Sequence, residues 1–323
     1  MELYNAGPLR WPLMYVTDSR QRSAGWAVIN APIVSPSRYE QFAALRRAGF
    51  RFIGMSSDGE FPRLAEADTL DSTAICEAWC HCFREPDRYL PRGTPRALIS
   101  NSDLTDPRRV AAEVAQIGGT DEHHADFVYV GATEPWKRQV KNWRLAQRAI
   151  PRMCEALGLR ALVVGAPELS PSSHIMCVPL LPWRELLARI ARAKFLFVPN
   201  IDDASPRVLT EALALDVPVV VHREIIGGWK YVNAFTGVFF DGQDDLVDSV
   251  RSCIERAMKP RRWFEANFGP YHAGTRLLDL LRPLDPSIAE RSHLGLSDRV
   301  EEDQERRAIT FTTKRASPSI GEQ

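Results

Sequence analysis

The residues best placed to do chemistry are two acids and three bases between residues 137 and 211. Asp203 and Glu211 lie two helical turns apart, and Arg207 stands between them. Lys137 and Lys141 lie one turn apart, where a loop enters a helix. Carboxylates accept hydrogen bonds from hydroxyl groups, whereas basic side chains and the free N–H groups of a helix N-terminus bind phosphates. The set therefore suits a ligand that carries both hydroxyl and phosphate groups.

Alternating strands and helices must position these residues. Apolar runs predict strands over residues 126–130, 160–164, 195–199 and 217–221, separated by helices over 140–157, 183–193 and 206–215. Such alternation favours a parallel sheet with right-handed crossovers. Ligands bind beyond the carboxyl ends of parallel strands. We therefore expect the binding rim in the loops 131–141, 200–206 and 222–230.

The front of the chain also alternates. Strands are predicted over 12–17, 50–55 and 96–100, and a helix over 37–48, where Phe42, Leu45 and Ala48 recur at helical spacing. Two stretches are interpreted as small-residue loops, residues 23–26 and 58–59. The pattern indicates an α/β layer that is short for a complete doubly wound domain.

Three regions follow from this pattern. We predict a short N-terminal α/β domain over residues 1–122, a Rossmann-like C-terminal domain over 123–285 and a disordered tail over 286–323. The tail is rich in charge and Ser and lacks a sustained apolar period. His123 and His124 precede the first strand of the second domain and are assigned to a linker.

The composition argues against several classes of partner. The 41 Lys and Arg residues balance the 41 Asp and Glu residues, so no overall field favours nucleic acid. The N-terminus does not resemble a signal peptide, and no apolar run approaches the ~20 residues of a membrane helix. The six cysteines are scattered, as in a reducing compartment. We expect a cytoplasmic protein without a transmembrane segment, and peripheral membrane contact stays open.

One cysteine cluster resembles a metal site only superficially. Cys76, Cys80 and Cys82 surround His81, but structural zinc sites use two Cys-x2-Cys pairs, and no second pair exists. Helical cysteines are usually buried small apolar residues. We therefore predict no metal site and no cofactor.

Residues 199–221 resemble the signature of the GT-B retaining glycosyltransferases, especially family 4 (glycosyl transferases group 1). That signature has a strand ending in Pro, an acid, seven further positions, Glu-Ala and a turn before Pro-Val-Val. Here Asp203 and Glu211 hold the two acidic positions. Upstream, Gly131 followed by Lys137 resembles the family's first loop. Downstream, the pair at 227–228 resembles its Gly-Gly loop, and residues 236–240 resemble its late glycine-containing strand.

The resemblance implies a GT-B fold, with two Rossmann-like domains and parallel sheets. It implies a glycosyltransferase that moves a sugar from a nucleotide-diphosphate donor to an unknown acceptor, with retention of anomeric configuration and without an essential metal. In the family the second acid, here Glu211, contacts the ribose, and the first, here Asp203, lies near the donor sugar.

Candidate roles can then be given to individual residues. Neutralising the leaving diphosphate requires cations or helix N-termini. Ser205 is predicted to cap the helix that begins near Pro206. The glycine pair permits close approach of backbone to ligand, and Trp229 beside it could stack on the ligand, whereas Trp143 is assigned to the core. The catalytic candidates are Asp203, Lys137 and Arg207, and the binding candidates are Gly131, Lys141, Ser205, Glu211, Gly227, Gly228 and Trp229.

Departures from the family pattern keep a second hypothesis open; the short front domain and Asp203 favour it, whereas Glu211 and Lys137 favour catalysis. Asp203 replaces the usual Glu, Ala132 replaces a frequent basic residue, and residues 204–206 replace Gly-Phe-Gly. The alternative is a non-catalytic GT-B-like protein that binds a nucleotide or glycan, or supports a partner enzyme. A dinucleotide-dependent enzyme is disfavoured because no Gly-x-Gly-x-x-Gly follows the first strand of the second domain.

Overall fold

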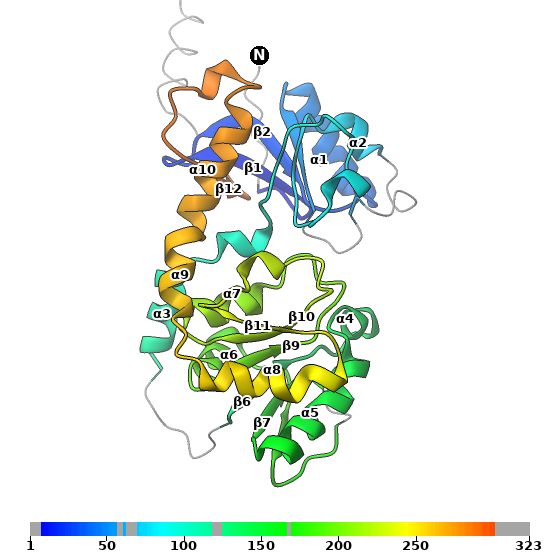
Figure 1. Ribbon diagram of the computed structural model, residues 1–323. Helices are drawn as coiled ribbons and strands as arrows, with labels where there is room; N and C mark the ends of the chain where they lie inside the picture. The colour runs from blue at the N-terminus through cyan, green and yellow to red at the C-terminus, as the bar shows by residue number, and fades with distance from the viewer. Residues whose placement is uncertain (1–7, 57–60, 63–69, 118–124, 167–168, 301–323) are drawn as a thin grey trace, which may run out of the picture.

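The computed structural model describes residues 8–56, 61–62, 70–117, 125–166 and 169–300. The predicted loop at 58–59 and the linker histidines His123 and His124 lie outside these residues. The strands form two six-stranded sheets. Figure 1 shows the two sheets in separate α/β bodies, one above the other, with α9 (Pro260–Asn267) and α10 (Pro270–Leu281) running alongside from the second body to the first.

The N-terminal sheet has the strand order β12-β1-β2-β3-β4-β5. Its strands are β1 (Leu13–Asp18), β2 (Ser23–Ile29), β3 (Arg51–Met55), β4 (Ala78–Cys80), β5 (Arg96–Ala97) and β12 (Leu294–Ser297). The strands β2 to β5 run parallel, whereas β1 pairs antiparallel with both β2 and β12. The predicted parallel sheet thus accounts for four strands, and antiparallel pairs complete the other edge.

A long helix lies on each face of this sheet. The helix α1 (Pro36–Arg47) packs on one face, where the predicted core residue Phe42 is buried. On the other face α10 buries Leu277 and Leu281 against the strands. The N-terminal body is therefore completed by a helix that comes from the far end of the chain.

The C-terminal sheet has the order β11-β10-β9-β6-β7-β8, and all its pairs are parallel. Its strands are β6 (Phe127–Val130), β7 (Ala161–Val164), β8 (Ile175–Val178), β9 (Phe195–Val198), β10 (Val219–His222) and β11 (Gly237–Phe240). Valines 219–221 are fully buried because helices cover both faces of the sheet. This is the architecture that the strand and helix pattern predicts.

Five helices sandwich the C-terminal sheet. One face is covered by α5 (Trp143–Leu157) and α8 (Gln243–Glu255), and the other by α6 (Trp183–Ile190), α7 (Arg207–Ala214) and α9. Trp143 lies in the core as predicted, stacked on Tyr129. The helices α6 and α7 begin at the carboxyl edge of the sheet, where the predicted site lies.

The prediction of a disordered tail from residue 286 is wrong for its first part. Residues 286–288 form the short helix η5 (Pro286–Ile288), and β12 then pairs with β1, opposing Ser297 to Tyr15. Residues 301–323 lie outside the described part of the chain. The predicted domain boundary at 285 also differs from the structure, because α10 already belongs to the N-terminal body.

Two local predictions also need correction. Residues 23–26, expected to be a loop, begin β2, and Trp26 is fully buried with its Nε1 donating to Asp285 at 2.8 Å. The helix expected over 140–157 is interrupted at Asn142, which has a φ of 49°. That break separates α4 (Pro135–Val140) from α5.

The remaining elements are short. They are α2 (Ser72–Ile75), η2 (Pro86–Arg88), η3 (Asn101–Leu104), α3 (Pro107–Ala115) and η4 (Trp229–Tyr231). Of these, η3 and α3 lead from the N-terminal sheet toward the C-terminal one and contact α7. Among the described residues, every helix is too short or too polar to span a bilayer.

Candidate functional site

An ion pair at the carboxyl edge of the C-terminal sheet joins two of the predicted residues. Lys141 Nζ donates to Asp203 Oδ2 at 2.7 Å, from the end of α4 to the loop after β9. Asn200 Nδ2 donates to the same oxygen at 2.8 Å, and the Ser205 N–H donates to Oδ1 at 3.2 Å. Asp203 is buried. Its carboxylate is therefore held rigidly, with a lysine ammonium directly against it.

Glu211 lies on the second turn of α7 beside this pair. Its Oε1 accepts a hydrogen bond of 2.8 Å from Nε1 of Trp183, the first residue of α6. Burial raises the pKa of Glu211 above its ordinary value, against the indole hydrogen bond and the positive charges of Arg207 and Lys141, which lower it. The carboxylate thus lies within electrostatic reach of both cations. Raised carboxyl pKa values of this kind cluster at functional sites.

The structure places Lys137 differently from Lys141. Lys137 Nζ pairs with Glu134 Oε1 at 2.6 Å within the short helix α4, and its side chain is 43% exposed. It also lies 5.3 Å from the ring centroid of the exposed Trp136. Lys141 is therefore the lysine that joins the acidic residues of the site, and Lys137 stands at its solvent side.

Gly131 follows β6 at the same edge. Its N–H donates to the Val164 carbonyl at 2.8 Å, and an added Cβ would lie 3.1 to 3.3 Å from its nearest neighbours. The close packing around Gly131 comes from the neighbouring strand β7 and from Tyr129. A side chain here would press on the first loop of the site.

Ser205 does not cap α7 as predicted. The N-cap position is Pro206, which has no side-chain capping bond. The Ser205 hydroxyl instead accepts from the Ser102 N–H at 2.8 Å and lies 2.7 Å from the Ser102 hydroxyl. One turn further, the Thr210 and Thr105 hydroxyls lie 2.7 Å apart. The entry to α7 is therefore bound to η3 and to the residue after it, in the segment that joins the two domains.

The glycine pair serves the chain's own packing. A Cβ on Gly227 would lie 1.8 Å from the Ala204 carbonyl oxygen, so Gly227 permits a close approach between two loops. Gly228 has a φ of 85°, which favours glycine. Next to it, Trp229 Nε1 donates to the Cys82 carbonyl at 2.8 Å. The expected stacking surface of Trp229 is thus anchored to the N-terminal domain.

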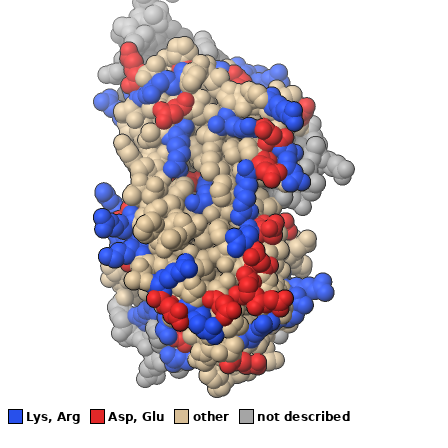
Figure 2. All heavy atoms as spheres, viewed as in Figure 1, with Lys and Arg blue, Asp and Glu red and all other residues tan. Residues whose placement is uncertain are grey.

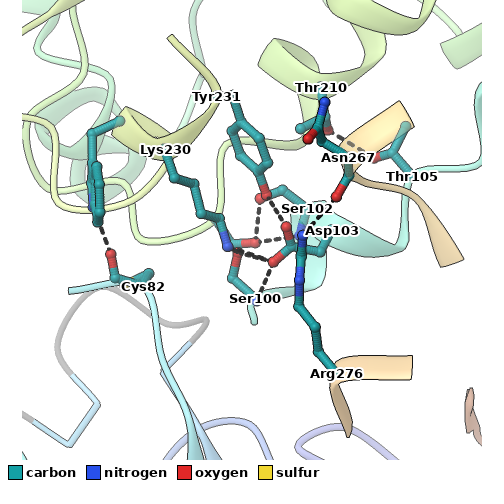
Figure 3. A network of polar contacts seen from close by, with 12 residues as sticks. Cys82, Ser100, Ser102, Asp103, Thr105, Thr210, Lys230, Tyr231, Asn267 and Arg276 are labelled. Atoms are coloured by element: carbon teal, nitrogen blue, oxygen red, sulfur yellow. Dashed lines mark hydrogen bonds and ion pairs between the residues drawn. The ribbon is translucent and has the colours of Figure 1, made fainter. Parts of the chain in front are cut away.

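A buried charge network continues this interface. Lys230 Nζ binds Asp103 Oδ2, and the two side chains are 3% and 0% exposed. Tyr231 donates to Asp103 Oδ1 at 2.9 Å, and the Ser100 N–H donates to Oδ2 at 2.6 Å. Figure 3 shows Lys230 and Tyr231 converging on the Asp103 carboxylate from the C-terminal domain. The two domains therefore meet through fully engaged polar groups.

Contacts with the N-terminal domain engage part of the predicted rim, at Ser205, Trp229 and Lys230. Arg84 extends them by donating to the carbonyls of Ile225 at 3.1 Å and Arg223 at 2.7 Å. Two hollows, of about 470 and 460 Å³, lie around residues 268–272 and beside α8. Figure 2 shows acidic and basic side chains interspersed over the visible face, in keeping with equal numbers of each sign.

The cysteine cluster behaves as small apolar packing. Cys76, Cys80 and Cys82 are buried thiols outside disulfide bonds, and burial raises the pKa of Cys80 to about 12. Burial lowers the pKa of His81 to about 4, helped by the charges of Lys230 and Arg96. Among the described residues, no group of three or more His, Cys, Asp or Glu side chains is arranged to hold a metal ion.

Several residues of the site escape prediction from sequence. Trp183 could have been found, because it opens a helix that follows a strand at the carboxyl edge of the sheet. Asn200 lies on the predicted rim and could likewise have been noted. Lys230 also lies on the predicted rim, but its pairing with Asp103 carries no such signal, since the two are 127 positions apart and belong to different domains.

Comparison with known proteins places the fold. The structure is similar to sucrose-phosphate synthase from Thermosynechococcus elongatus, with a TM-score of 0.55 and 14% identity over 80% of this chain and 74% of that one. It is similar to the lipopolysaccharide outer core galactosyltransferase WaaB, with a TM-score of 0.55 and 12% identity over 80% and 75% of the two chains. An α,α-trehalose-phosphate synthase from Burkholderia xenovorans gives 0.52 and 11% over 81% and 71%.

No protein-family model matches the chain, and no curated protein sequence matches it. At these low identities the structural likeness establishes the fold alone. The expected GT-B fold, with two α/β domains, is thereby confirmed.

Proposed function

We propose that this protein is a glycosyltransferase that takes its sugar from a nucleotide-diphosphate donor bound at the carboxyl edge of the C-terminal sheet. The observation that carries the proposal is the convergence of Lys141, Asp203 and Glu211, with Arg207 acting on the same glutamate. A fold whose neighbours include sugar-transferring enzymes supports it.

The charges suit the parts of such a donor. Glu211 accepts hydrogen bonds from the ribose hydroxyls, which favour the ionised carboxylate. Lys141 and Arg207 neutralise the diphosphate as the glycosidic bond breaks, because charge that develops on the leaving group is stabilised by fixed cations. The anomeric carbon then bonds to an acceptor hydroxyl oxygen with retention of configuration, and the hydroxyl proton passes to the departing diphosphate. This chemistry needs no metal, since side chains supply the positive charge.

The proposed role of Asp203 differs from that of Glu211. Its carboxylate already accepts from Lys141, Asn200 and the Ser205 N–H. We assign it to orienting Lys141 toward the diphosphate, with sugar contact through its remaining lone pairs. Lys137 stands further out and attracts the donor from solvent.

The proposal is tested by thermal stabilisation with a panel of UDP-, GDP- and ADP-sugars. Ligand at about 1,000 times its Kd stabilises the folded protein by about 4 kcal/mol. We expect one nucleotide series to raise the melting temperature of the wild type and of Glu255→Ala, an exposed glutamate on α8. Glu211→Ala should lose that shift. Absence of a shift with every nucleotide would reject the proposal.

A second candidate is a non-catalytic protein that binds a nucleotide or glycan. The contacts of Ser205 with Ser102 and of Trp229 with Cys82 favour it, because they engage predicted binding residues within the domain interface. Under this alternative a nucleotide sugar raises the melting temperature but is not consumed.

A further inference from the structure

The indole of Trp183 is the polar partner of Glu211 that the sequence did not reveal. The two residues come from neighbouring helices, α6 and α7, and are joined by the 2.8 Å hydrogen bond from Nε1 to Oε1. Within the described part of the chain, Oε2 of Glu211 has no hydrogen-bond donor among the protein groups. One oxygen of the carboxylate is thus fixed, and the other is left for a ligand.

Apolar burial does not explain a tryptophan at this position. Trp183 is 37% exposed, whereas Leu187 and Ile190 of the same helix are fully buried. A tryptophan that exposes much of its ring while its N–H is satisfied by a carboxylate is held for that polar contact.

A second contact fixes the ring from another element. The guanidinium carbon of Arg109 lies 5.6 Å from the ring centroid of Trp183, within the range of a cation–π interaction. Arg109 lies in the first turn of α3, where the Asp106 carboxylate accepts from its backbone N–H. The indole is therefore oriented from α3, which packs against both α6 and α7.

We propose that Trp183 is a positioning residue for Glu211, which aims the free carboxylate oxygen at the ribose hydroxyls of the donor. The inference rests on the proposed function for the identity of the ligand. Its physical basis is general: a carboxylate with one oxygen fixed loses less freedom when the other oxygen binds.

The hydrogen bond has a second effect that can be measured without any ligand. An N–H donor favours the ionised carboxylate and so lowers the pKa of Glu211, against the burial that raises it. Removing the donor should raise the pKa of Glu211 further in the free protein. A tryptophan that merely filled space would leave it unchanged.

The first test is a double-mutant cycle on donor affinity, measured calorimetrically with the best stabilising nucleotide sugar at pH 7.5. Trp183→Phe keeps a ring and removes the N–H, and should weaken binding about tenfold, the loss of one hydrogen bond to a charged group. In a Glu211→Gln background the same change should alter Kd less than twofold. Trp11→Phe, a half-exposed tryptophan of the N-terminal domain, serves as control.

The second test follows the Glu211 carboxyl carbon by NMR between pH 3 and pH 8 in the free protein. Trp183→Phe should move the titration midpoint of Glu211 upward. Trp183→Leu, which also lacks the N–H, is used instead if Trp183→Phe folds poorly, and the same upward shift is expected. The inference would be overturned by an unchanged titration midpoint. It would also be overturned if Trp183→Phe weakened binding equally in the wild-type and Glu211→Gln backgrounds. If the wild type binds no nucleotide sugar while the midpoint still moves, the proposed function fails and the positioning contact stands.

Discussion

Lys230 of the C-terminal domain forms a buried ion pair with Asp103 of the segment that leaves the N-terminal sheet. Both charges are taken out of water, which is costly unless each is matched. The Asp103 carboxylate is well matched, because Tyr231 and the Ser100 backbone N–H donate to it in addition to Lys230. A few buried polar contacts therefore help to fix the relative placement of the two domains, in addition to any apolar contacts between them.

Loss of Lys230 should therefore be costly. Lys230→Met leaves Asp103 buried without its counter-charge and should lower the free energy of unfolding by about 3–5 kcal/mol, measured by urea denaturation. Arg251→Met, which breaks the exposed pair with Asp248, should cost no more than about 1 kcal/mol. Equal losses of unfolding free energy in the two variants would show that the buried pair is worth no more than an exposed one.

The loop contact at Gly227 gives a steric prediction. Gly227→Ala places a methyl group 1.8 Å from the Ala204 carbonyl oxygen, so the loops must separate. We expect a loss of at least about 2 kcal/mol of unfolding free energy. Gly295→Ala, whose new methyl would meet only Thr17 Oγ1 at 3.9 Å, is the matched control and should stay within about 1 kcal/mol. A stable Gly227→Ala variant would contradict the described loop packing.

The contribution of β12 to the N-terminal sheet can be tested by substitution as well. Leu294 is fully buried between the N-terminal sheet and its helix, so Leu294→Ala should cost about 2–5 kcal/mol. Leu296 is only partly buried, and its replacement by Ala should cost less than half as much. If Leu294→Ala melts at the wild-type temperature, β12 does not contribute to the N-terminal core.

The raised pKa of Glu211 predicts opposite effects of pH on stability and on donor binding. Since the folded pKa lies above the unfolded one, this group stabilises the fold at low pH, and the contribution is lost as pH rises through the folded value. Glu211→Gln should therefore unfold at a higher temperature than the wild type at pH 7.5 but not at pH 4, measured by calorimetry.

Donor binding should follow the reverse course. It requires the ionised carboxylate, so affinity should fall as pH drops through the pKa of Glu211. Glu211→Gln should bind weakly with little pH dependence. A wild-type affinity that is flat between pH 4 and pH 7.5 would argue against ionised Glu211 as the ribose ligand.

Prediction from sequence succeeds where the determinants are local. The C-terminal strands are short β-branched or aromatic runs, so their burial on both faces is visible in the sequence. Asp203 and Glu211 were singled out by the family resemblance of one continuous segment, and their role in binding stays a prediction. Lys141 was expected to reach a phosphate, and the structure adds its pairing with Asp203.

Prediction fails where distant segments meet. The strand β2 begins with Ser23 and contains Gly25, so its sequence resembles a loop until it pairs with β1 and β3. The strand β12 is set by pairing with a partner 280 residues away, which no local pattern encodes. The contacts of Ser205 with η3 and of Trp229 with Cys82 were not predicted, because the domain interface brings these distant segments together.

The central claim is most directly tested by following the donor itself. Proton NMR of the anomeric signal, with the stabilising nucleotide sugar and wild-type protein, reports both cleavage and stereochemistry. We predict slow release or transfer of the sugar with its anomeric configuration retained, and loss of turnover in Glu211→Ala but not in Glu255→Ala. A donor that binds but stays intact, with acceptors of several classes present, would contradict the transferase and leave a binding protein in its place.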